Sequence, residues 1–330
     1  MLKKQAAGYG LIIPFARTFA SVVLPSVKAL VEAKAYGEIP DLLAESNSSN
    51  SNPFSFLSIV SEPHRNTIVD EILQAWISIR PRSRAKTAYS SLLSYTLQYQ
   101  KSLPLALAVL QHFLRSGSSP HQQFYLTLAS SWIDRVKLLE SPSKVLEEMK
   151  TIGYRPDCGL CNFVMSSLCA VDRIREAQDL LQGMAEAECP PNAASYGIVI
   201  AAMCDAGRTA TAVNLLNEML LKEKLMPRQN TVWKVVATLK VKGEHRKAAK
   251  VIQELEKAGC AIQFGVYESL VKGCVNCHDY VMAARVIVRM ANRGFVAHIT
   301  TRQSVVEGLD AAGKSDLASA LRQRLADMNS

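Results

Sequence analysis

The sequence lacks a hydrophobic run long enough to cross a bilayer. Residues 11–31 form the most apolar stretch, but two prolines and two basic residues interrupt it, whereas a spanning helix needs about 20 predominantly apolar residues. Acidic residues are also missing from the N-terminus, where Glu32 is the first. We therefore expect no membrane span, and the basic, acid-free start is typical of an organellar transit peptide. The alternative is the first helix of the fold, because residues 27–43 have the pattern of a helix pair.

The motifs of catalysis and cofactor binding are missing as well. None of the six histidines begins the His-x-Glu string of zinc-dependent deaminases. No phosphate-binding loop, Gly-x-Ser-x-Gly or Gly-x-Gly-x-x-Gly string occurs. The eight cysteines are dispersed through a chain without a secretory signal, which favours reduced, buried thiols over disulfides or a zinc site. We therefore expect no catalytic residue, no metal and no cofactor.

Basic residues outnumber acidic ones, and the net charge is +9. A basic protein suits a polyanionic partner such as nucleic acid, although a solvated Lys/Arg face gives the same balance. Residues 61–121 and 229–263 each carry seven basic and three acidic residues, whereas 158–192 carries two basic and five acidic residues. The first two segments are therefore the better candidates for contact with a polyanion.

A period of about 35 residues runs through the C-terminal three quarters of the chain. Long apolar residues recur with this step at Met149, Met184, Met219, Leu255, Met290 and Leu325. Alanines recur with the same step at Ala177, Ala212, Ala248, Ala283 and Ala318. Glycines at Gly207, Gly243 and, two steps on, Gly313 keep the register. Three residue classes in one register indicate a repeat protein.

Each period has the pattern of two helices. In residues 193–228 the first apolar stripe has spacings of three and four, and Gly207 separates it from a second stripe that includes Ala212 and Met219. One such hairpin cannot bury its apolar face alone, so successive hairpins must stack. The sequence predicts an all-α, superhelical solenoid of about seven to eight helix-turn-helix repeats.

These units resemble the pentatricopeptide repeat (PPR) family, in its pure-repeat form from plant organelles. The shared features are a cysteine after the core of the first helix, a Gly-Arg turn, alanine in the second helix, methionine at its end, and a closing Pro-Asn or Pro-Asp. In this register the array 87–330 divides into 87–121, 122–157, 158–192, 193–228, 229–263, 264–298 and a partial unit 299–330. Ahead of it we expect a transit peptide and N-terminal helices in 1–44, a polar linker in 45–53 and a degenerate helical repeat in 54–86.

The resemblance implies binding of single-stranded RNA, with about one base per repeat. In the family, the fifth and last residues of a unit read the base. Asn162 with Asn192 matches the pair that favours a pyrimidine. The other candidates fit in part or are nonstandard: Ser91, His121, Asp157, Trp233 and Gln263. Gly197 with Arg228, and Glu268 with His298, offer no familiar reader, and Glu268 would place a negative charge near the RNA.

Two further groups of residues are candidates for RNA contact. Lys240 and Lys242 fall at the end of a first helix and in its turn, where the family places phosphate-contacting lysines, and Arg246 and Lys247 follow; a solvated face is the alternative. Trp233 either stacks on a base or packs between repeats.

The expected function is that of a mitochondrial (alternatively chloroplast) protein that binds organellar RNA and acts in processing, stability or translation. The alternative is a structural or assembly component of an organellar ribosome or other complex, which contacts proteins and the rRNA backbone.

Overall fold

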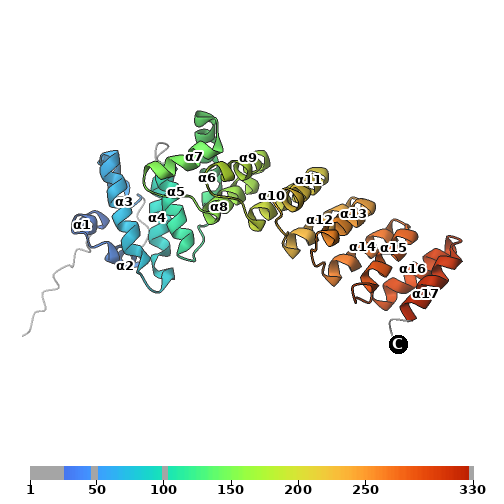
Figure 1. Cartoon of the computed structure of the whole chain (residues 1–330). Coiled ribbons are helices and arrows are strands. Elements are labelled where there is room, and N and C mark those ends of the chain that lie inside the picture. Colours follow the sequence, from blue (N-terminus) through green and yellow to red (C-terminus); the bar gives the residue numbers. More distant parts are fainter. Residues whose placement is uncertain (1–25, 46–50, 99–102, 327–330) are drawn as a thin grey trace, which may run out of the picture.

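The computed structural model describes residues 26–45, 51–98 and 103–326, and within these ranges every regular element is a helix. The helices follow one another along an elongated array, as Figure 1 shows. The transit peptide and N-terminal helices are expected within 1–44, of which 1–25 lie outside the described residues, as do residues 46–50 of the expected linker. None of the described helices is long and apolar enough to cross a membrane.

Helices α4 to α17 form consecutive hairpins, as the sequence predicts. The first helices of the hairpins are α4 (Lys86–Gln98), α6 (Gln123–Leu139), α8 (Cys158–Ala170), α10 (Ala193–Asp205), α12 (Gln229–Val241), α14 (Phe264–Asn276) and α16 (Ile299–Ala311). The second helices are α5 (Leu103–Arg115), α7 (Pro142–Thr151), α9 (Ile174–Glu186), α11 (Thr209–Leu221), α13 (His245–Lys257), α15 (Tyr280–Ala291) and α17 (Ser315–Ala326).

The turn inside each of the last five hairpins holds a residue with left-handed dihedrals. These residues are Asp172, Gly207, Gly243, His278 and Gly313, with φ between 55° and 72°. In the turn at Gly207, the Arg208 amide donates to the Met203 carbonyl at 2.8 Å, the bond that closes a helix C-terminus of this type. Glycine adopts this conformation without strain, whereas Asp172 and His278 carry a cost of about 1 kcal/mol.

The periodic apolar residues form the core. The alanines of the series are fully buried, and Met149, Met184, Met219 and Met290 are buried beside them. A small residue at the alanine position lets paired helices approach closely, and the flexible methionine fills the space that remains. One apolar core therefore runs the length of the array.

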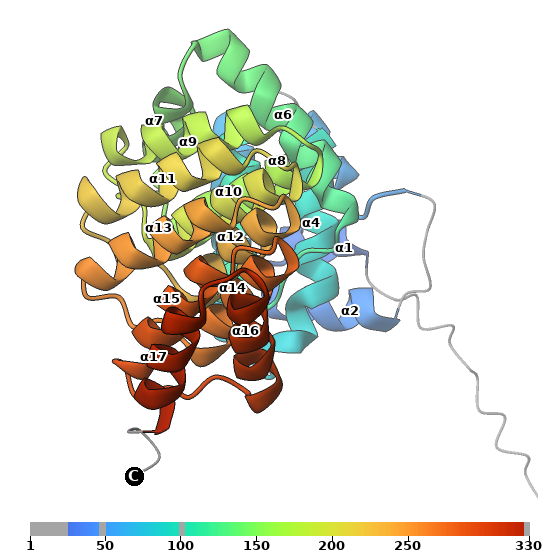
Figure 2. The same ribbon diagram turned by 90° about the vertical axis from the view of Figure 1, so that its right-hand side faces the viewer.

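The two helices of each hairpin lie in separate rows. Figure 2 shows the odd-numbered helices α7 to α17 along one side and the even-numbered helices α6 to α16 along the other. Neighbouring even helices from α4 to α16 pack directly on each other, whereas in the odd row the pairs α9–α11, α11–α13 and α13–α15 touch little. In the middle of the array the even row is therefore the more closely packed of the two.

The N-terminal region continues both rows with irregular elements. It contains α1 (Val27–Glu32), η1 (Tyr36–Glu38), α2 (Ile39–Glu45), η2 (Ser55–Ile59), α3 (Glu62–Ile77) and η3 (Arg82–Ala85). Helix α2 packs on α4 and α3 packs on α5, so α2 and α3 take the places of a first and a second helix. The segment 54–86 therefore supplies one long helix, and α2 completes the hairpin.

Candidate nucleic-acid interface

The fifth residues of the units lie on the even row, and their surroundings differ sharply. Asn162 is half-buried, Leu126 is 65% exposed and Trp233 is 47% exposed. Glu268 is buried at 5% exposure. Only some of these positions can therefore present a side chain to a ligand along the row.

The last residues of the units are N-caps of the even helices. Asp157, Asn192, Arg228, Gln263 and His298 precede α8, α10, α12, α14 and α16. His121 lies one residue before the cap of α6. The two kinds of candidate reader thus lie along one edge of the even row, at the N-terminal ends of its helices.

Asn162 and Asn192 are joined by a buried serine that the sequence did not single out. The Asn192 side-chain oxygen accepts from the amides of Ala194 and Ser195, at 2.9 and 3.1 Å. The Ser195 hydroxyl accepts from the Asn192 amide at 3.1 Å and donates to Asn162 Oδ1 at 2.7 Å. Because both side-chain oxygens are occupied, the NH₂ groups of the two asparagines remain as hydrogen-bond donors.

Asp157 is held by protein contacts. Its carboxylate accepts from the Leu160 amide at 2.9 Å and forms an ion pair with Arg115 at 2.7 Å. Burial alone would raise the pKa of Asp157, but the hydrogen bonds and the charge of Arg115 outweigh it and lower that pKa. A ligand that contacted Asp157 would therefore meet an Asp–Arg pair.

The Trp233 ring rests on the next unit and keeps an open face. A Cβ atom on Gly265, in the first turn of α14, would lie 3.6 Å from Trp233 Cζ3. One edge of the ring therefore lies within contact distance of the first turn of α14. Since 47% of Trp233 stays exposed, packing between units and stacking on a base are compatible here.

Three other fifth positions are covered. Glu268 accepts a hydrogen bond from Thr301 at 2.6 Å and lies 3.5 Å from Lys272, so its charge is withdrawn from the surface, contrary to the expectation from sequence. A Cβ on Gly197 would come within 2.9 Å of the Thr231 hydroxyl. The Ser91 carbonyl accepts from the side chain of Asn52 at 2.9 Å.

Comparison with known proteins decides the family. The profile of the PPR repeat family matches residues 156–205, and that of the PPR repeat matches 194–223. A pentatricopeptide repeat-containing protein from Arabidopsis thaliana is 41% identical over 326 residues, which covers 98% of this chain and 95% of that protein. The chain belongs to the PPR family.

Two more Arabidopsis proteins match this PPR protein over shorter stretches. A mitochondrial pentatricopeptide repeat-containing protein is 29% identical over 151 residues, 45% of this chain and 24% of its own. The small ribosomal subunit protein mL103 (rPPR7) is 34% identical over 68 residues, 20% of this chain and 16% of its own.

Among solved structures, the PPR protein is similar to maize PPR10 in complex with an 18-nt psaJ RNA element. The TM-score is 0.36 at 17% identity, with 92% of this chain and 53% of that chain covered.

The basic candidates of this PPR protein lie at the junction of α12 and α13. The Lys242 ammonium donates to the Gly207 carbonyl, Arg246 pairs with Asp279 at 3.0 Å, and Lys247 pairs with Glu244 at 3.2 Å. Lys240 forms no ion pair within the described residues, and its stem packs where Gly273 lacks a side chain. Of the four, Lys240 is the cation with the fewest protein partners.

The unit 158–192 also gathers three cysteines. Cys158 and Cys161 lie in the first turn of α8, and Cys189 lies in the loop after α9, with Cys189 Sγ 3.9 Å from Cys158 Sγ. Within the described residues, no group of His, Cys, Asp or Glu has the arrangement of a metal site. Three more buried cysteines lie outside this cluster and belong to the apolar core: Cys204, Cys260 and Cys274.

Proposed function

We propose that this PPR protein binds single-stranded organellar RNA along its even row and acts in RNA processing, stability or translation. It does so by occupying the strand, without catalysing a reaction. The observation that carries the proposal is the Asn162–Ser195–Asn192 network, in which a buried serine orients two asparagines at the surface. Another member of the family, maize PPR10, has been crystallised with RNA.

The chemistry of the network favours a pyrimidine. The side-chain oxygens of the two asparagines already accept from protein donors, and their NH₂ groups remain to donate, so the pair suits a base edge with adjacent acceptors. Cytosine presents two adjacent acceptors, N3 and O2, on its Watson–Crick edge, and uracil presents two carbonyl acceptors on either side of its N3–H. Adenine has one acceptor beside one donor, and guanine has two adjacent donors. The base opposite unit 158–192 is therefore a pyrimidine, and cytosine fits best.

Trp233 and Lys240 extend the surface beyond this unit. An exposed aromatic face stacks on any base, and a cation two turns further along α12 neutralises phosphate, so both residues bind RNA without regard to sequence. With one full asparagine pair, the protein reads one base strongly and holds the neighbouring bases by stacking and charge.

A mitochondrial location is part of the proposal, with the chloroplast as the alternative. It is supported by the basic, acid-free N-terminus and by the similarity to a PPR protein named as mitochondrial.

The second candidate function is that of a structural component of an organellar ribosome. Two observations favour it: most fifth positions lack a familiar reader, and a small ribosomal subunit protein, mL103 (rPPR7), is similar over 68 residues. In this case the basic surface would contact rRNA backbone and neighbouring proteins rather than bases.

Sedimentation of the native protein from organellar extract distinguishes the two functions. The RNA-binding proposal predicts a light, ribonuclease-sensitive complex, and the purified protein should bind single-stranded RNA more tightly than a duplex of the same sequence. Stable co-migration with ribosomal particles at high salt would favour the ribosomal role instead.

A further inference from the structure

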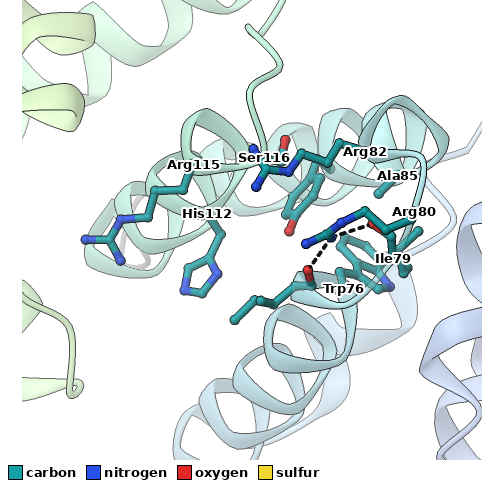
Figure 3. Close-up of a pocket in the computed structure, with 10 residues that line it drawn as sticks. Trp76, Ile79, Arg80, Arg82, Ala85, His112, Arg115 and Ser116 are labelled. Carbon is teal, nitrogen blue, oxygen red and sulfur yellow. Dashed lines mark hydrogen bonds between the residues drawn. The ribbon is translucent and has the colours of Figure 1, made fainter.

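A small cavity opens between α3, α4 and α5, away from the asparagine pair. Its volume is 180 Å³, equal to about six water molecules at liquid density. Trp76 and Tyr89 form its apolar wall; both are 2% exposed, with ring centroids 4.9 Å apart. Figure 3 shows Arg80, Arg82 and His112 arranged around the hollow.

The lining of this cavity is basic and contains no acidic residue. Arg80 Nη1 donates to the carbonyls of Ile77 and Ile79, both at 2.8 Å, which fixes the guanidinium and leaves its charge uncompensated. Arg82 is exposed and makes no hydrogen bond or ion pair to any described residue. Two cations thus face the opening, one of them fixed in advance by the backbone.

His112 supplies a buried polar group to the same cavity. It is 8% exposed, and its ring packs edge-on against Tyr154, with centroids 5.7 Å apart. Its ring nitrogens form no hydrogen bond within the part of the chain that the structure describes. A buried polar side chain ordinarily has a partner, so His112 is available to donate to a ligand in the cavity.

Two carboxylates that act on residues of the lining have protein partners of their own. Asp157 pairs with Arg115, and Asp70 accepts from the Tyr154 hydroxyl at 2.5 Å. Neither belongs to the lining.

Arg115 connects the cavity to the candidate RNA surface. It lines the cavity and also pairs with Asp157, the N-cap of α8 and a base-reading candidate. The cavity therefore lies at the N-terminal end of the line of caps that includes Asn192. A strand that follows this line reaches the cavity at one of its ends.

We propose that this cavity, lined by Arg80, Arg82 and His112, binds the terminal phosphate monoester of the RNA strand. The inference rests on the proposed RNA binding and adds the recognition of a strand end. A monoester carries nearly two negative charges at neutral pH and has three free oxygens, which match two guanidinium groups and a ring N–H. An internal diester carries one charge and continues into chain on both sides, so it suits an open groove better than a small cavity.

The test compares one RNA sequence in three forms: 5′-phosphorylated, 3′-phosphorylated, and with hydroxyls at both ends. At constant salt, one phosphorylated form should bind about tenfold more tightly than the hydroxyl form, as expected for added charge-assisted hydrogen bonds. Arg82→Ala and Arg82→Glu should remove this preference, so that each variant binds the phosphorylated and hydroxyl forms with equal affinity. His112→Gln should weaken it in part, because an amide can still donate.

Arg208→Ala is the matched control, since it removes an exposed arginine from the turn after α10, far from the cavity. It should change the affinity for all three RNAs by the same factor. Equal binding of the three forms by the wild-type protein would overturn the end-recognition inference while leaving RNA binding intact. Absence of binding to any form would overturn the proposed function. In that event, the wild-type protein and Arg82→Glu are titrated with uridine monophosphate, with tryptophan fluorescence as the readout. A saturable change in the wild type alone would support the phosphate site, and its absence would overturn that proposal.

Discussion

Replacing the buried Ser195 with alanine should lower the stability of the folded protein. The side chain is fully buried, and its hydroxyl makes one accepted and one donated hydrogen bond. The substitution leaves the Asn192 amide and the Asn162 side-chain oxygen without these partners. Each lost hydrogen bond of this kind costs about 1 kcal/mol, and loss of half a capping box costs a similar amount. We expect Ser195→Ala to lower the free energy of unfolding by about 1–3 kcal/mol.

Ser166→Ala is the matched control. The Ser166 hydroxyl donates to the Asn162 carbonyl one turn back along α8, at 2.8 Å, a bond that contributes little to helix stability. Its substitution should change the free energy of unfolding by less than about 0.5 kcal/mol.

Urea unfolding followed by circular dichroism measures the loss, and hydrogen exchange locates it. Since each hairpin contacts mainly its neighbours, faster exchange should concentrate in α8 and in the first turn of α10. If Ser195→Ala proves as stable as Ser166→Ala, the network does not orient the two asparagines and the reasoning fails.

Three further sets of substitutions test other parts of the protein. Trp233→Ala should weaken single-stranded RNA binding by about 5- to 150-fold, the effect of one lost stacking contact. Trp233→Phe should recover part of that loss. If the wild type and Trp233→Ala bind RNA with equal affinity, the ring serves packing alone. Burial, followed by the positive charge of Arg115, lowers the pKa of His112 below its ordinary 6.5. The unfolded chain therefore binds more protons than the folded one, and stability is lost as the pH falls below about 6.5. His112→Gln should make the stability depend less on pH between pH 7 and 5. Thermal unfolding measures this dependence. Asp70, Arg115 and Tyr154 also face this ring and are kept in both proteins. The last change replaces four basic residues together by alanine: Lys240, Lys242, Arg246 and Lys247. It should reduce the slope of log affinity against log salt by about one to three. An unchanged slope would assign these residues to a face that RNA does not touch.

The array was predictable because its signals are local and repeated. Alanine, methionine and glycine recur in one register, and each has a short-range cause: close helix approach, space filling and a left-handed turn. The turns at Asp172 and His278 lack glycine yet adopt the same conformation, because the packing of the flanking helices outweighs the small strain. The N-terminal hairpin departs from the 35-residue spacing, and no periodic signal pairs α2 with α3.

The surroundings of the candidate readers were not predictable in the same way. Asn162 and Asn192 follow from the register, but Ser195, which joins them, belongs to the next unit and looks like any helical serine. The burial of Glu268 depends on Thr301 from the following hairpin. Each contact crosses between units, so its geometry is set by stacking and not by local sequence.

The cavity at Arg80 shows the same limit. The charge of segment 61–121 is evident in the sequence, but the convergence of Arg80, Arg82 and His112 depends on how α3 and α5 pack. The Arg-Pro-Arg-Ser-Arg string at 80–84 was the available signal, and it does not reveal that Arg84 turns to Asp41 while its neighbours face the cavity.

If the protein reads a base through Asn162 and Asn192, a binding selection on randomised RNA will reveal the preference. The wild-type protein should enrich a pyrimidine, foremost cytosine, at one position. Asn162→Thr keeps a hydroxyl but removes the amide donor, and by family resemblance it should move the preference at that position toward adenine. The wrong base there should cost about 1–3 kcal/mol, or roughly 5- to 150-fold in affinity, by analogy with base readout in DNA. Selection of RNAs with no base preference by both proteins, at the same salt dependence, would contradict sequence reading and favour the ribosomal role.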